Sequence, residues 1–148
     1  MIYIELKESG FESEIDTYFK ELDKLTENIA DDVTAIADEA IHENILLSRG
    51  IDGKPVTPLA PFTVALKSFL GYPYPSRPLY MSGDMLNSVM SDKNHNIFIS
   101  GKADDYAWRV VYGINEAGRD QPPRDFFHVF DSPSTDKTIN KSIKMFYR

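Results

Sequence analysis

The sequence predicts an α+β domain in which one long N-terminal helix packs on a small, mostly antiparallel sheet. A helical stripe runs from Phe11 to Arg49 without a proline or glycine, shorter segments with alternating apolar residues lie before and after it, and a proline-rich arm separates the two halves. With 148 residues the chain is expected to form one domain: a strand plus the long helix over 1–49, the arm over 50–88, and the sheet with a C-terminal helix over 89–148.

The N-terminal part begins as a strand and continues as a helix. From Ile2 to Leu6 apolar residues alternate with polar ones, which is typical of a short strand with one buried face. The apolar residues that follow are spaced by three or four positions and form one helical stripe: Ile15, Tyr18, Phe19, Leu22, Leu25, Ile29, Val33, Ile36, Ala37, Ala40 and Ile41. Gly50 favours the end of the helix. Thr26 could cap a second helix, so the pattern leaves a continuous and a kinked helix open.

The arm, Gly50–Ser88, is rich in both proline and large apolar residues. It holds six of the nine prolines and four of the eight glycines, so no long helix or strand runs through it. Short helices are expected over 63–70 and over 83–90, the second capped by Ser82. Because a disordered linker lacks large apolar residues, we expect the arm to be buried, against its own domain or against a neighbouring subunit.

The last third of the chain supplies the sheet. Ile97 and Ile99 alternate with their neighbours in a predicted strand that ends at Gly101, and the region of Val89 is its predicted partner. The segment 103–113 supports two interpretations. Its aromatic residues alternate as in a strand, whereas the acidic pair at its start and the glycine at its end are typical of a helix.

The C-terminal residues are expected to form a helix. Residues 126–130 are apolar and form either a strand or the lead into that helix. Ser134 or Thr135 could cap it. Its apolar face would consist of Ile139, Ile143 and Phe146.

Charge is distributed unevenly along the chain. Residues 1–48 carry 13 acidic and 3 basic side chains, a net charge of −10, whereas residues 49–148 carry 10 acidic and 13 basic ones, a net charge of +3, giving −7 in total. The acidic helix is either a solvated face or a surface that attracts the basic face of another subunit. A net negative chain is a poor candidate for nucleic-acid binding.

The chain has no cysteine, no apolar run of the roughly twenty residues that span a membrane, and no signal-peptide pattern at its start. These features favour a cytosolic protein that has no membrane span, no disulfide bonds and no thiol chemistry.

Catalytic motifs are missing from the sequence. Glu39 and His42 have the i, i+3 spacing of one half of a di-iron site, and Asp104 with Asp105 could contact a cation. We therefore predict no catalytic, cofactor-binding or metal-binding residues, and keep a small metal-dependent hydrolase as an alternative.

Two arginines lie beside prolines that restrict their backbone. Arg77 precedes Pro78, and Arg124 follows Pro123. Each could form an internal salt bridge, to Asp84 or Asp125, or an ion pair across a subunit interface. Trp108 is expected in the core or as an interface anchor.

Four segments, taken together and in this order, resemble a known family. They are GKPVTPL at 53–59 with Thr63 and Lys67, RPLYMSGDMLNS at 77–88, Tyr106-Ala107 with Gly113, and PPRDFF at 122–127. This set resembles the virion morphogenesis proteins of tailed phages, the tail-completion proteins similar to the Mu G protein.

The resemblance implies a non-enzymatic structural protein that acts in tail completion or head–tail joining, in the virion and, during assembly, in the host cytoplasm. Related proteins form rings, often six-fold. Its partners would be further copies of itself and other tail or connector proteins, with no nucleic acid, membrane or cofactor. The residues predicted at subunit or partner contacts are Pro58, Leu59, Phe62, Lys67, Arg77, Leu79, Tyr80, Trp108, Arg124 and Phe126. A monomeric adaptor that binds one partner through an open sheet edge is a further alternative.

Overall fold

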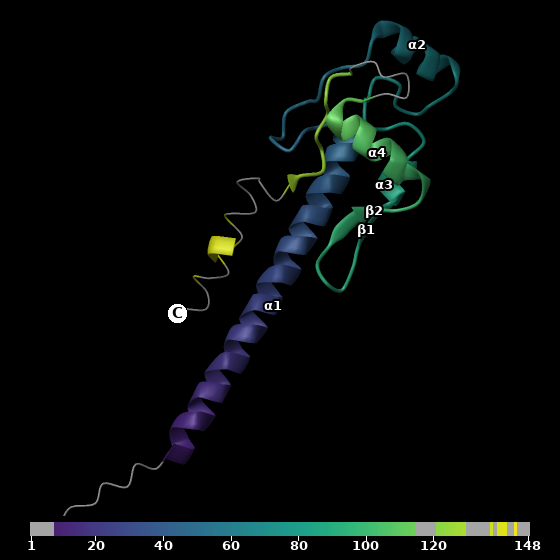
Figure 1. Ribbon diagram of the computed structural model, residues 1–148. Helices are drawn as coiled ribbons and strands as arrows, with labels where there is room; N and C mark the ends of the chain where they lie inside the picture. Colours follow the sequence, from purple (N-terminus) through teal and green to yellow (C-terminus); the bar gives the residue numbers. More distant parts are fainter. Residues whose placement is uncertain (1–7, 115–120, 130–136, 138, 142–143, 145–148) are drawn as a thin grey trace, which may run out of the picture.

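A computed structural model of the chain describes residues 8–114, 121–129, 137, 139–141 and 144. Within these residues the elements are α1 (Glu8–Leu47), α2 (Pro61–Phe69), α3 (Asp84–Asn87), β1 (Val89–Ser91), β2 (Ile97–Ile99) and α4 (Lys102–Tyr112). Figure 1 shows one long helix with the remaining elements gathered around its C-terminal end. The predicted α+β class is confirmed by this long helix, the antiparallel pair of strands and the additional helices.

The long helix is continuous. It spans 40 residues, which corresponds to about 60 Å. Thr26 does not cap a second helix, because its hydroxyl donates a 2.9 Å hydrogen bond to the carbonyl oxygen of Leu22, one turn back in the same helix. Residues 10–20 are all exposed, whereas Ala37, Ile41 and Ile45 are fully buried. The C-terminal half of α1 is therefore the centre of the core, and the N-terminal half projects from it (Figure 1).

The core forms where the two strands, α3 and α4 meet the last turns of α1. Val89 pairs with Ile99 and Ser91 with Ile97 in an antiparallel register, as predicted. The largest fully buried side chain is that of Phe126, which packs in one cluster with Ile41, Ile45 and Val129. The residues around Phe126 do not form the strand that was one of the two predictions, because 121–128 are irregular. The other prediction, a lead into the C-terminal helix, concerns residues that extend beyond the described ones.

The ambiguous segment 103–113 is a helix. Ala103, Ala107 and Val111 lie four residues apart and are buried, which is the spacing of one helical face. The aromatic residues suggested a strand but lie on the outer faces, with Trp108 43% and Tyr112 62% exposed. The prediction of Trp108 as a core residue is thus wrong, because the small side chains of α4 face the core.

The arm contains the two predicted short helices with different bounds. α2 begins at Pro61, two residues before its predicted start. α3 is a single turn, and its N-cap is Gly83 rather than Ser82. The Ser82 hydroxyl instead donates a 2.6 Å hydrogen bond to the carboxylate of Asp84. Val89, predicted within this helix or paired with the following strand, belongs to β1.

The predicted N-terminal strand lies outside the described residues. Of the predicted C-terminal helix, residues 137, 139–141 and 144 are described, and all of them are helical. In the described part of the chain, no helix is both long enough and apolar enough to cross a membrane.

Candidate protein-interaction surface

The arm is fastened to the C-terminal end of α1 by hydrogen bonds to backbone groups. The Ser48 hydroxyl accepts a 3.1 Å hydrogen bond from the backbone N–H of Leu79, and the Leu79 side chain is 3% exposed in the core. Arg77 donates through Nη1 to the carbonyl oxygen of Leu46 at 2.8 Å. Since the last carbonyls of a helix lack intrahelical partners and carry partial negative charge, a guanidinium satisfies them well.

Lys67 holds the arm closed on itself. Its ammonium donates to the carbonyl oxygens of Arg77 and Tyr80, at 2.8 and 2.7 Å. The residue is 7% exposed, and burial lowers the pKa of the Lys67 ammonium below its usual value. The Lys67 ammonium thereby connects α2 to the extended segment that follows it and holds the helix in its orientation.

Aromatic rings support the same segment. The Arg77 guanidinium lies 4.1 Å from the centroid of the Tyr74 ring, a cation–π contact. Tyr74 in turn packs edge to face against Tyr80, with ring centroids 5.1 Å apart. These contacts give the proline-rich segment a defined shape without regular secondary structure.

The segment Pro122–Phe127 joins the arm to the core. Arg124 is 8% exposed and donates through Nε to the carbonyl oxygen of Thr57 at 2.9 Å. Asn44 donates to the carbonyl oxygen of Phe126 at 3.2 Å, and Ile51 donates its backbone N–H to the carbonyl oxygen of Asp125 at 3.0 Å. This segment therefore connects α1 with the beginning of the arm.

Neither arginine forms the predicted salt bridge with Asp84 or Asp125. Both guanidinium groups bind backbone carbonyl oxygens, of Leu46 and Thr57. Burial lowers the pKa of Arg124, and Tyr106 partly opposes this; burial also raises the pKa of Tyr106. The salt-bridge prediction is wrong because the last turn of α1 at Leu46 and the irregular backbone at Thr57 leave carbonyl oxygens without a backbone partner, and these attract a nearby guanidinium as an acidic side chain does.

The outer face of α2 presents apolar side chains to the surface. With Lys67 turned inward, Phe62 is 79% and Phe69 87% exposed, and Leu66 and Leu70 are exposed as well. These four residues, spaced four, three and one positions apart, share one side of the helix. We call them the α2 face. A contiguous exposed apolar group of this kind is typical of a protein-interaction site.

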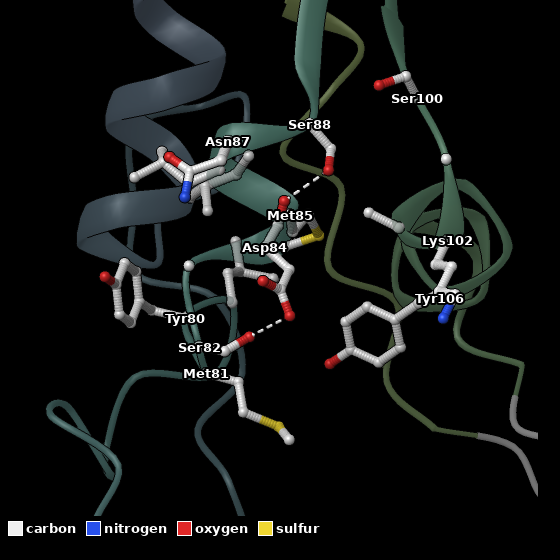
Figure 2. A pocket seen from close by; sticks show the side chains of 16 residues that line it. Tyr80, Met81, Ser82, Asp84, Met85, Asn87, Ser88, Ser100, Lys102 and Tyr106 are labelled. Atoms are coloured by element: carbon white, nitrogen blue, oxygen red, sulfur yellow. Dashed lines mark hydrogen bonds between the residues drawn. The ribbon is translucent and has the colours of Figure 1, made fainter.

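Two clefts lie near the arm. The first, the α3–α4 cleft, has a volume of about 630 Å³ and is lined by residues that include Leu79, Met81, Met85 and Tyr106. Figure 2 shows Met81 at its edge and the Asp84 carboxylate directed toward the side of the cleft where Tyr106 lies. The Asp84 backbone carbonyl also accepts a 2.6 Å hydrogen bond from the hydroxyl of Ser88.

The second cleft lies between the arm and α4 and has a volume of about 710 Å³. It is lined by three of the predicted contact residues, Pro58, Leu59 and Arg124, together with Tyr106 and Arg109. Residues far apart in the sequence thus meet in one concave surface.

The ten residues predicted at contacts divide into three groups. Leu79 and Phe126 are in the core, and Lys67 and Arg124 are buried and bind backbone. Leu59, Arg77 and Tyr80 are half-buried. Side chains exposed at the surface are Pro58, Phe62 and Trp108. The buried residues therefore shape the surface, and the exposed ones are available for contact.

The alternative of a metal-dependent hydrolase would need a set of metal ligands. In the described residues, no three histidine, aspartate or glutamate side chains lie close enough together to hold a metal ion. His42 Nδ1 lies 2.8 Å from the carbonyl oxygen of Asp38, in its own helix.

The predicted contact residues did not include Leu66, Phe69 and Leu70 of the α2 face, or Met81, Met85 and Asp84 in the α3–α4 cleft. The spacing 62, 66, 69 and 70 was a signal for the α2 face, but which side of a short helix is exposed depends on Lys67 turning inward.

Comparisons of the chain with models of protein families, with curated proteins and with solved structures find no match.

Proposed function

We propose that this chain is a non-enzymatic structural protein of a tailed phage or prophage, which acts in tail completion or head–tail joining. It would self-associate, in a ring of the kind that the resemblance implies, and bind other tail or connector proteins. It would work in the virion, after assembly in the host cytoplasm. The four sequence segments at 53–67, 77–88, 106–113 and 122–127 support the proposal.

The observation that carries the proposal is the combination of a rigid arm with an exposed apolar face. Lys67 and Arg77 hold the arm through bonds to backbone carbonyl oxygens, while Phe62 and Phe69 remain 79% and 87% exposed. Because the backbone that carries these aromatic side chains is already held in place, binding through them costs little backbone entropy, which favours a protein contact. Residues of the segments 53–67, 77–88, 106–113 and 122–127 also line the cleft between the arm and α4.

The test is complementation in a phage or prophage that encodes the chain. Deletion of the gene is expected to leave heads and tails unjoined in electron micrographs and to abolish infectious particles. The wild-type chain supplied in trans should restore them, whereas Phe62→Ser/Phe69→Ser should not. The matched control is Ser68→Ala, at an exposed position of the same helix, which should restore particles fully.

A normal yield of joined particles after deletion would contradict the proposed role. Full restoration by Phe62→Ser/Phe69→Ser would contradict the part assigned to the α2 face.

The adaptor alternative is favoured by one observation, the open edges of the sheet. In the described residues the sheet contains only β1 and β2, so each strand pairs on one side. Met90 and Phe98, paired across the two strands, are 50% and 39% exposed. A peptide could add to such an edge, although each strand offers only three residues. A chain that binds one partner while remaining monomeric would support this alternative.

A further inference from the structure

The projecting half of α1 carries an apolar seam with the spacing of a coiled coil. The seam residues are separated alternately by four and three positions: Phe11, Ile15, Tyr18, Leu22, Leu25 and Ile29. This repeat keeps one stripe aligned along a partner helix over several turns. Phe11 is 69%, Tyr18 51% and Ile15 37% exposed, so no described part of the chain covers the N-terminal end of the stripe. We call these six residues the α1 seam.

The borders of the α1 seam are acidic. At the six positions that flank such a seam between residues 12 and 28, the chain has Glu12, Glu14 and Glu21 and no lysine or arginine. Over residues 10–32 there are eight acidic side chains and two lysines, a net charge of −6. Pairing of this helix with a second α1 would bring like charges together with no compensating cation at the borders. The surface therefore fits a basic amphipathic helix.

The chain itself contains a segment with the complementary pattern. Residues 137–148 carry three lysines and one arginine and no acidic side chain, a net charge of +4. Their apolar residues Ile139, Ile143 and Phe146 follow the same four-and-three spacing as the α1 seam. The described positions of the segment are helical, and Lys137, Lys141 and Lys144 are exposed. We call residues 137–148 the basic segment.

We propose that the α1 seam is the docking site for the basic segment of a second copy of this chain. Within one chain Phe11, Ile15 and Tyr18 of the seam and the lysines at 137, 141 and 144 are exposed, so both sets of side chains are accessible to a second copy. A contact between two different surfaces of identical chains is heterologous, and it passes from copy to copy until a ring closes or a filament grows. This inference names the surfaces through which copies of the chain would associate. It rests on the proposed function only in assuming that the chain self-associates.

The test uses two full-length variants with opposite charge changes. The first, Glu14→Lys/Glu21→Lys, makes the borders of the α1 seam basic. The second, Lys141→Glu/Lys144→Glu, makes the basic segment acidic. Each is expected to weaken self-association by at least about tenfold, measured by sedimentation velocity over a concentration series, because two ion pairs become repulsive. All four positions are exposed, so both variants should keep the wild-type circular dichroism.

Mixing the two variants is the decisive step. In the mixture, the wild-type basic segment of the first variant can bind the wild-type acidic α1 seam of the second. The acidic segment of the second variant can likewise bind the basic seam of the first. Association should therefore return on mixing, and should weaken as salt is raised because exposed ion pairs are screened. The matched control, Asp16→Lys/Glu27→Lys, changes two acids that lie away from the seam and should leave association unchanged.

Three results would overturn the inference. Self-association unchanged in both variants would show that copies meet through other surfaces, and would leave the proposed function standing. Variants that fail to associate on mixing, although all four changes in one chain restore the wild-type behaviour, would place the basic segment on the α1 seam of its own chain. A full-length chain that stays monomeric and binds no synthetic peptide of residues 134–148 would remove the contact altogether, whether or not complementation in the phage succeeds.

Discussion

Arg77 donates a 2.8 Å hydrogen bond to the carbonyl oxygen of Leu46, so a residue of the arm closes the last turn of α1. The same guanidinium stacks on Tyr74, 4.1 Å from the ring centroid. Two features of the sequence, the end of the long helix and the rigid proline-rich segment, are thus joined by one side chain.

Replacement of Arg77 should loosen this junction. Arg77→Met removes the hydrogen bond and the cation–π contact, and we expect the free energy of unfolding to fall by about 1–2 kcal/mol. Urea denaturation followed by circular dichroism measures the change. Arg49→Met is the control, because Arg49 forms an exposed 3.6 Å ion pair with Glu43 whose loss should change stability by about 0.5 kcal/mol or less. Equal effects of the two variants would argue against a special role of Arg77.

Loss of Lys67 should be more damaging. Lys67→Met keeps the length of the side chain but leaves the partly buried carbonyl oxygens of Arg77 and Tyr80 without their donor. We expect a loss of about 2–3 kcal/mol in the free energy of unfolding. Lys54→Met serves as the comparison, since Lys54 is exposed and pairs with Asp52 at 3.5 Å.

The pH dependence of stability should also report on Lys67. Its pKa is lowered by burial from 10.5, so the unfolded chain holds this proton more tightly than the folded one. The free energy of unfolding therefore gains a contribution that rises with pH between the lowered pKa and 10.5. The rise should be absent in Lys67→Met, and an identical pH profile for both proteins would contradict the assignment.

Gly113 should tolerate no side chain. It ends α4 with φ of 76°, and a Cβ there would overlap the backbone of Gln121 and Pro123. Gly113→Ala is expected to cost about 3 kcal/mol or more, because backbone strain and overlap add. Gly53→Ala is a matched control: φ is 74°, but no atom lies within 4 Å of the position that a Cβ would take, so only the strain of about 1 kcal/mol remains. Thermal unfolding of both variants separates the two contributions.

The turn between β1 and β2 should show a lowered carboxyl pKa. Asp92 accepts hydrogen bonds from the side chain of Asn96 and from the backbone N–H groups of Asn96 and Asn94, and these lower its pKa below 3.8. The stability that the carboxylate gives the hairpin is therefore present above pH 3.8 and lost as pH falls through the lowered pKa. Asn96→Ala should move the pKa, measured by NMR titration, back toward 3.8.

The sequence predicted most of the long helix well, because residues 11–49 contain no proline or glycine and carry one apolar stripe, which leaves few alternatives. It predicted the pairing of β1 with β2 for a similar reason, since a short alternating segment needs a neighbouring strand. It did not decide between helix and strand for α4. Tyr106, Trp108 and Tyr112 alternate as in a strand, yet the residues that determine the fold are Ala103 and Ala107, whose small side chains let α4 approach the core closely.

The candidate surface was predicted in part. The sequence indicated that the arm is apolar and rigid, and that its arginines are held in place. It could not indicate their partners, because Leu46 and Thr57 accept hydrogen bonds through backbone carbonyl oxygens, which every residue has. It also could not show that Phe69 would be exposed while Leu79 is buried, since that difference depends on how the arm turns around Lys67.

The projecting half of α1 also acts as a lever. Phe11 lies 26 residues before the buried Ala37, which places the tip of the helix about 39 Å from its anchorage. A tilt of about 10° at the anchorage would move that tip by about 7 Å. A small adjustment of the packing around Ile41 would therefore displace the N-terminal end of α1, and any partner bound there, by several times as much. In this way α1 can transmit a local change in the core to a distant binding site.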